Sequence, residues 1–301
     1  MKINIDSIIP LIEFFRNDYF NKEQFKKLIK TNGMKGFLEQ ERSKGRNINI
    51  REEIEKIIFN SEYKDEYGFY KFKKNLDFIE KDIKKIKTQE KYIIEKALEK
   101  NYKIIPKEMK IKCKIYLYFG GEDGGFTVSR NKIYINYGMY MNNLEELIKI
   151  LSHELYHCRN ISYKNRICFS FKTFFDKYGK IYEIIGKILE EGLAALVQHG
   201  NILKIDDPAG TLSNRSLLLI KDEFELLNNI ILDIKKNIPY NKKLKKLNLY
   251  AIGYYIVSTI YNTDGVLILD NWTVELKYEE ILKRYIEICN EKNLHMNLIE
   301  I

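Results

Sequence analysis

The chain has 301 residues, of which 45% are apolar and 31% are charged, a composition that is typical of folded proteins and excludes a disordered chain. Lys and Arg outnumber Asp and Glu by 51 − 42 = 9, but these charges are spread along the whole sequence and require no acidic partner. Four cysteines without a CxxC spacing exclude a disulfide scaffold. Because we find neither a secretion signal nor an apolar stretch long enough to cross a bilayer, we expect a cytoplasmic protein that contacts no membrane and no nucleic acid.

Residues 1–105 have the pattern of helices separated by short polar breaks. Apolar side chains such as Ile79, Ile83 and Ile86 recur at helical spacing, with charged residues between them. We therefore expect an N-terminal helical region over residues 1–105.

The pattern then changes to that of a small sheet followed by helices. Residues 112–119 and 132–137 alternate as strands do, and a glycine-rich run connects them, so we expect a sheet within residues 112–137. Asn143, with a Glu three residues later, is typical of a helix start. Helices are predicted at 144–160, 179–199, 215–236, 247–263 and 273–293. This order of elements predicts an α+β fold dominated by helices, with a C-terminal helical subdomain at 215–293.

One predicted helix carries the sequence His-Glu-Leu-Tyr-His at residues 153–157. Positions i and i+4 lie on one face of a helix, so His153 and His157 can bind the same metal ion. Catalytic zinc sites use about three protein ligands and keep a position for water, and Glu154 stands where it can accept a proton from that water. The motif predicts one Zn²⁺ per chain, with Glu154 as the general base; a core helix with two hydrogen-bonded histidines is the alternative.

A third ligand is expected downstream, where residues 188–196 read ILEEGLAAL. Glu191 falls in the apolar stripe of this helix, three residues after Ile188 and four before Ala195, whereas Glu190 falls on a more polar face. A carboxylate in an apolar interface is costly unless it is paired or bound to a metal. We therefore predict that Glu191 is the third ligand. Glu190 is expected either to contact the ligands without binding the metal or to be solvated.

Small residues follow these two glutamates. Gly192, Ala194 and Ala195 would let this helix approach the helix of His153 and His157 closely. The other interpretation of this region, in which both glutamates are merely exposed, stays open.

The two motifs together resemble the gluzincin clan of zinc metallopeptidases, in which the third ligand is a Glu on a following helix. The gluzincin aminopeptidases carry a similar Asn-Glu-Gly-x-Ala run, in which Glu191 matches their ligand and Glu190 stands where they have Asn. The closer likeness is to small bacterial predicted zinc-dependent peptidases with the same HExxH and EGxA arrangement. The likeness covers residues 112–265 and implies a gluzincin-like catalytic domain with a zincin-like core at 106–301.

A second match concerns Tyr250-Ala-Ile-Gly253, which is similar to the Tyr-x-x-Gly helix of that family. The resemblance implies that Tyr250 donates to the oxyanion of the tetrahedral intermediate; a buried structural tyrosine is the alternative. It also implies that substrate pairs with a strand just before the active helix, at 132–137 or 115–119. Gly124 and Gly125 would then let the substrate backbone come close, unless the glycine-rich run is a plain hairpin turn.

Other notable side chains are expected to be structural. We expect Cys158 to be a small buried residue and neither His199 nor His295 to be a ligand. An aromatic run is expected to lie in the core rather than in a specificity pocket: Phe169, Phe171, Phe174 and Phe175.

The leading hypothesis is a cytoplasmic zinc metallopeptidase that acts on peptides or on an unfolded segment of a protein. The alternative is a zinc-binding hydrolase of another kind, or a lapsed enzyme that serves as a binding or regulatory protein. A basic nucleic-acid-binding protein with an incidental HExxH is a third hypothesis. The substrate, the cleavage preference and the oligomeric state do not follow from the sequence.

Overall fold

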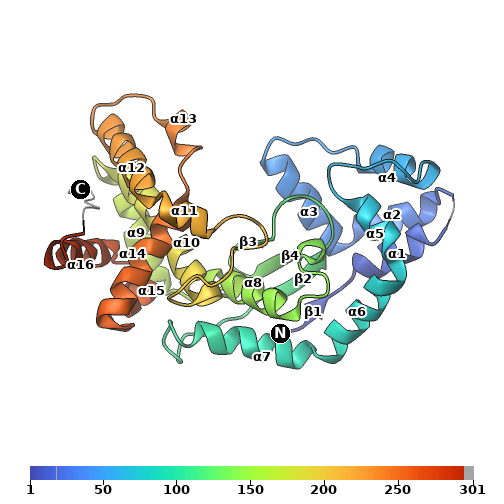
Figure 1. Cartoon of the computed structure of the whole chain (residues 1–301), viewed down its shortest axis with the longest axis horizontal. Helices are drawn as coiled ribbons and strands as arrows, with labels where there is room; N and C mark the ends of the chain where they lie inside the picture. The colour runs from blue at the N-terminus through green and yellow to red at the C-terminus, as the bar shows by residue number, and fades with distance from the viewer. Residues whose placement is uncertain (18, 295–301) are drawn as a thin grey trace. The chain divides into compact units, whose positions relative to one another are not determined.

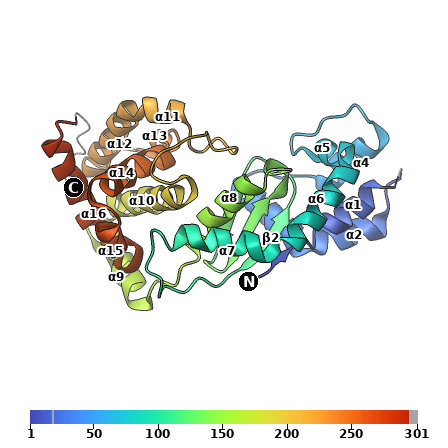
Figure 2. The same ribbon diagram turned by 60° about the horizontal axis from the view of Figure 1, so that its bottom comes forward.

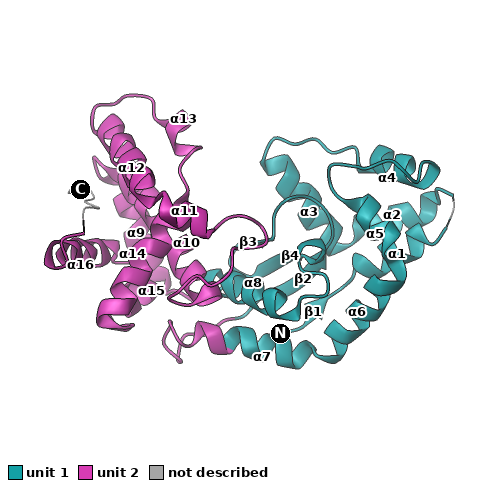
Figure 3. Ribbon diagram, in the orientation of Figure 1, with its two compact units in different colours: residues 1–98, 112–158 teal, residues 99–111, 159–301 magenta. Residues whose placement is uncertain are grey.

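The structure is a computed structural model that describes residues 1–17 and 19–294. It forms two compact units, the first from residues 1–98 and 112–158 and the second from residues 99–111 and 159 onwards (Figure 3). Sixteen α-helices and four short strands in the described ranges (Figure 1) confirm the predicted α+β fold dominated by helices. The domain division expected at residue 105 stays a prediction.

Helices of the first unit form mostly where the sequence predicts apolar faces. Ile79, Ile83 and Ile86 are the buried residues of α6, as their spacing predicted. The elements of this unit are β1 Ile3–Asn4, α1 Ile8–Phe15, α2 Lys22–Lys30, α3 Asn32–Ser43, α4 Ile50–Phe59, α5 Phe69–Lys74, α6 Leu76–Thr88, α7 Glu90–Asn101 (which continues into the second unit), β2 Lys114–Tyr118, β3 Gly125–Val128, β4 Lys132–Asn136, the 3₁₀ helix η1 Tyr137–Met139 and α8 Leu144–His157.

The four strands of this unit form one sheet in the order β1-β2-β4-β3. β2 is parallel to both β1 and β4, whereas β3 is antiparallel to β4. β4 has a strand neighbour on both sides, so the expectation that substrate pairs with residues 132–137 is wrong. β2 has β4 on one side and pairs with β1 on the other side only at Ile115 and Tyr116. The expectation for residues 115–119 is therefore contradicted at these two positions and stays a prediction for the rest of the strand. β3 is the edge strand on the β4 side of the sheet.

Alternate residues of β3 point to opposite faces of the sheet and meet different helices. Phe126 stacks on Tyr134, at 4.9 Å between ring centroids, on the face where Gly36 of α3 lies against Tyr134. Gly125 and Thr127 point to the other face, where they meet Glu154 of α8. The sheet thus has α3 on one face and α8 on the other.

Within the residues that the structure describes, the second unit contains helices and no strand, apart from the isolated bridge between Ile111 and Arg159. Its helices are α9 Tyr163–Phe175, α10 Gly179–His199, α11 Asn214–Leu218, α12 Ile220–Lys235, α13 Asn241–Leu244, α14 Leu249–Asp264, α15 Leu267–Glu275 and α16 Tyr278–Glu291. The single helix expected at 273–293 is thus the end of α15 followed by α16. Across both units, none of the helices in the described ranges combines the length and apolar character needed to cross a membrane.

α10 and α14 lie side by side (Figure 2) and cross at two glycines. A Cβ on Gly192 would lie 2.2 Å from the carbonyl carbon of Gly253, and a Cβ on Gly253 would lie 2.0 Å from the carbonyl oxygen of Ile188. Backbones approach this closely only where both residues lack a side chain. Gly192 therefore faces α14, and the expectation that it faces the helix of His153 and His157 is wrong. Successive helix residues point about 100° apart, so Gly192 does not share the direction of Glu191.

α9 is a helix that the sequence analysis did not predict, and it turns most of its aromatic side chains outward. Phe169 packs on Trp272, with 6.0 Å between ring centroids. Phe171, Phe174 and Phe175 are 58%, 81% and 78% exposed, so the expectation that they lie in the core is wrong. These three residues follow Phe169 by two, five and six positions, which places them on the opposite side of a helix.

Candidate metal centre

The helix α8 carries the HELYH motif in its last turn and a half. As predicted, Asn143 caps its N-terminus, where the side-chain oxygen accepts from the backbone N–H of Glu146 at 3.1 Å. Leu147 and Leu151 form part of its buried face. The helix ends at His157. The motif is therefore part of a helix whose start is set by the Asn143 cap and whose orientation is set by its buried apolar face.

The two histidines of the motif present the same ring nitrogen to each other. His153 Nε2 and His157 Nε2 lie 3.3 Å apart. Zinc binds imidazole nitrogen at about 2.0–2.1 Å, and tetrahedral angles then separate two such nitrogens by about 3.3–3.4 Å. His153 is buried and His157 is half-buried. The spacing of the two nitrogens therefore fits a single zinc ion with no change of rotamer.

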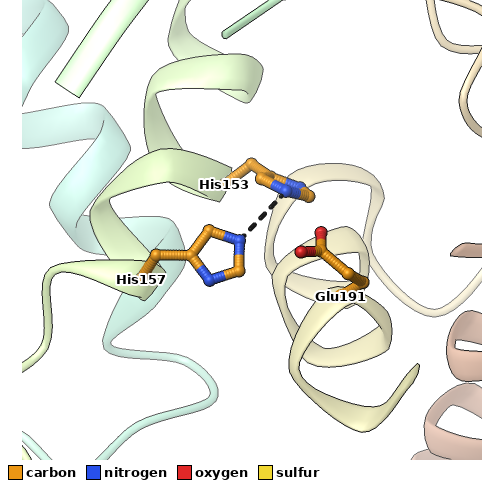
Figure 4. Close-up of side chains that lie close together, drawn as sticks. All are labelled: His153, His157 and Glu191. Atoms are coloured by element: carbon orange, nitrogen blue, oxygen red, sulfur yellow. Dashed lines mark hydrogen bonds between the residues drawn. The ribbon is translucent and has the colours of Figure 1, made fainter. Parts of the chain in front are cut away.

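Glu191 joins the two histidines in a group of residues that could hold a metal ion. One ligand atom from each of the three residues lies within 4.8 Å of the others, and the carboxylate of Glu191 points toward the two rings (Figure 4). Two imidazole nitrogens and one carboxylate oxygen are a donor set used by catalytic zinc, which leaves a position for water. The structure thus brings together the three residues that the sequence analysis proposed as ligands, in a group that could hold a metal ion.

Among the residues that the structure describes, the cysteine and the histidine that were also considered as possible metal ligands do not join this group. Cys158 is buried, as expected, and His199 is the last residue of α10; neither belongs to the group formed by His153, His157 and Glu191. His295 lies outside the described residues.

Glu154, the predicted general base, is buried and is held from the sheet. The hydroxyl of Thr127 on β3 donates to Glu154 Oε2 at 2.7 Å. A Cβ on Gly125 would lie 3.2 Å from Glu154 Oε1, so the absence of a side chain at Gly125 leaves room for this carboxylate. Gly124 precedes the strand, and its carbonyl oxygen accepts from the N–H of Asn136 at 2.9 Å. No pattern in the sequence indicates the role of Thr127, since a single Thr in a four-residue strand carries no motif.

Glu190, which the sequence predicted to be a supporting or solvated residue, forms an ion pair with Arg159. Arg159 Nη1 donates to Oε2 at 2.9 Å and Nη2 donates to Oε1 at 2.5 Å. The Arg159 side chain is fully buried, whereas that of Glu190 is 19% exposed. The role of Arg159 could not be predicted either, because nothing in the sequence around this arginine indicates a buried partner.

Tyr250 lies in the first turn of α14, three residues before Gly253, and is half-buried. Because Gly253 contacts Gly192, the face of α14 near Tyr250 is turned toward α10. The neighbouring tyrosines have structural contacts. The hydroxyl of Tyr254 donates to the carbonyl of Gly200 at 2.9 Å, and burial raises its pKa to about 12. The oxyanion role of Tyr250 stays a prediction.

Comparison with known proteins identifies a family for this chain. A family model with the description "Putative zinc dependent peptidase (DUF5700)" matches residues 25–294. The matched range includes the HELYH motif, Glu191 and Tyr250. No curated protein and no solved structure matches this chain.

Proposed function

The chain belongs to this DUF5700 family, and on that premise we propose that it is a zinc metallopeptidase of the gluzincin type. His153, His157 and Glu191 would hold the ion, and Glu154 would be the general base. The observation that carries the proposal is the convergence of these three ligands, in which the two Nε2 atoms have the separation that zinc requires.

The residues of this chain would each have a definite task in peptide hydrolysis. When bound, zinc supplies Lewis-acid catalysis and lowers the pKa of a coordinated water. Glu154 accepts the proton of the attacking water and delivers it to the leaving amine nitrogen. Thr127 donates a hydrogen bond to Glu154 Oε2, which restrains the orientation of the carboxylate. Tyr250 donates a hydrogen bond to the developing oxyanion, a contribution worth a few kcal/mol where such a donor operates.

The substrate we propose is a peptide or an unfolded protein segment in extended conformation. β3 pairs with β4 on one side only, so its other edge presents backbone groups to which an extended chain can add as a further strand. The same strand holds Glu154 through Thr127. A peptide bound along β3 would therefore lie beside the general base.

The first test is the metal content of untagged protein purified without added zinc, compared with His157→Ala and Glu191→Ala. We expect about one zinc per wild-type chain and a clear loss in both variants. If the wild-type protein takes up no metal even when zinc is supplied, the proposed function is wrong.

The second test separates an enzyme from a zinc-binding module that has lost its activity. Glu154→Gln should keep the metal and abolish cleavage in a peptide-library screen, because amide nitrogen and oxygen cannot act as the base. A wild-type protein that binds zinc and cleaves no peptide would instead support the binding or regulatory alternative.

A further inference from the structure

Arg159, two residues after His157, has a buried guanidinium group with directional contacts on both of its edges. Two of its nitrogens form the bidentate pair with Glu190, and Nε donates to the carbonyl oxygen of Thr273 at 3.1 Å. The side chain has no exposed surface. Its rotamer is therefore fixed by three hydrogen bonds to residues of the second unit, none of which requires a bound ligand.

The backbone around Arg159 is anchored as well. Arg159 forms an antiparallel bridge with Ile111, and the N–H of Asn160 donates to the carbonyl of Lys110 at 2.9 Å. The segment that follows the HELYH motif is thus held by backbone and side-chain contacts together, directly after α8 ends.

Chain connectivity turns this anchor into a restraint on the metal ligands. Two residues span at most about 7 Å of extended chain, so His157 cannot move far from the position of Arg159. At the other end of the ion pair, Glu190 immediately precedes Glu191 in α10. The pair is therefore a short link between the end of the HELYH motif and the helix turn that carries the third ligand.

An arginine paired with a glutamate is better suited to orient a neighbouring side chain than to stabilise the fold alone. A buried ion pair is a weak source of stability, since an apolar pair of similar volume often packs equally well. A bidentate pair between a guanidinium and a carboxylate also fixes direction, which an apolar pair or a lysine does not. Residues that orient metal ligands in this way commonly change metal affinity when they are replaced.

We propose that Arg159 is a positioning residue for the metal centre, which acts through Glu190 to fix where α10 presents Glu191. The inference rests on the proposed zinc site but does not depend on whether the protein cleaves peptides. It assigns to Arg159 and Glu190 the role of orienting Glu191, and none of binding the ion or the substrate.

The test compares zinc affinity with the stability of the metal-free protein in three variants. Arg159→Met with Glu190→Met replaces the ion pair by an apolar pair, and Arg159→Lys keeps the charge but removes the bidentate geometry. Lys172→Met with Glu279→Met is the control, because it removes an exposed ion pair of the same unit that joins α9 to α16. The zinc dissociation constant is measured by competition with a chromophoric chelator, and stability is measured by thermal unfolding without metal.

We expect the apolar double variant to unfold near the wild-type temperature while its zinc dissociation constant rises about 10- to 100-fold. Arg159→Lys should weaken zinc binding in the same direction, and the control should bind zinc as the wild type does. A dissociation constant within about twofold of wild type in both Arg159 variants would overturn the inference and leave the proposed function intact. If the apolar variant does not fold, the zinc dissociation constant of Arg159→Lys alone tests the inference. Failure of the wild-type protein to bind zinc would overturn the proposed function and the inference with it.

Discussion

The crossing of α10 and α14 at Gly192 and Gly253 gives a quantitative prediction for Gly192→Ala. The new Cβ would lie 2.2 Å from the carbonyl carbon of Gly253, whereas ordinary contacts begin at 3.4 Å. The helices must then separate by the difference, 3.4 − 2.2 = 1.2 Å. The new Cβ has a fixed position on its own backbone and meets backbone atoms of Gly253, so no side-chain rotation can relieve the contact.

The energy follows from two opposing contributions. Replacing Gly by Ala within a helix stabilises it by about 1 kcal/mol. Overpacking costs about 1–3 kcal/mol when side chains can adjust, and a gap of about 1 Å forfeits up to half of the dispersion energy of each contact along the interface. We therefore expect a net loss of about 2 kcal/mol, equivalent to a fall in unfolding temperature of about 4–8 °C.

Gly186→Ala is the matched control, because it lies on the same helix and has the same gain in helix propensity. Its Cβ would meet the tip of the Phe169 ring at 2.5 Å, and this half-buried side chain can move aside. Urea and thermal unfolding of the metal-free protein should show a destabilised Gly192→Ala and a Gly186→Ala within about 0.5 kcal/mol of wild type. If Gly192→Ala were as stable as the wild type, the two helices would not cross at these glycines.

Three further predictions concern single side chains. Thr127→Val should lower kcat for a cleaved peptide about tenfold, because the Glu154 carboxylate loses a hydrogen bond to its charged form. Thr127→Ser keeps the hydroxyl and should retain most of the activity. Equal rates in the wild type and both variants would contradict an orienting role of Thr127. Asn143→Ala should lower the free energy of unfolding by about 1 kcal/mol through loss of the α8 cap. Asn143→Asp can still cap the helix and should keep the wild-type free energy of unfolding, and urea titrations measure both variants. Phe174→Ser should leave the free energy of unfolding within about 0.5 kcal/mol of wild type, because the ring is 81% exposed. Phe169→Ala should lower the free energy of unfolding by about 2 kcal/mol. Similar losses in both variants would place Phe174 in the core.

The parts of the fold that the sequence could predict are those with a local signal. The cap at Asn143 and the apolar spacing within α8 and α10 operate over a few residues, so they identified both helices. The HELYH motif is local for the same reason, because the i and i+4 positions of one helix bring its two imidazoles together. Glu191 could be found from its place in an apolar stripe, which made an uncompensated carboxylate unfavourable.

The parts that were missed depend on partners distant in the sequence. β3 has four residues and begins with a glycine, and it is defined by its pairing with β4 rather than by its own propensity. α9 has an outward aromatic face, which reverses the hydrophobic pattern by which buried helix faces are recognised. Arg159 and Thr127 have roles only because Glu190 and Glu154 lie opposite them, and no pattern within the sequence pairs these residues.

The tripeptide Glu190-Glu191-Gly192 shows how one short sequence can satisfy three contacts. Successive residues of a helix point about 100° apart, so three neighbours address three directions: Glu190 binds Arg159, Glu191 points toward His153 and His157, and Gly192 admits the backbone of Gly253. Each neighbour constrains the other two, because α10 can neither rotate nor shift along its axis without losing at least one contact. If Glu191 is the proposed zinc ligand, its backbone must not move when the metal leaves, and the residues on both sides of Glu191 supply that restraint from within the second unit.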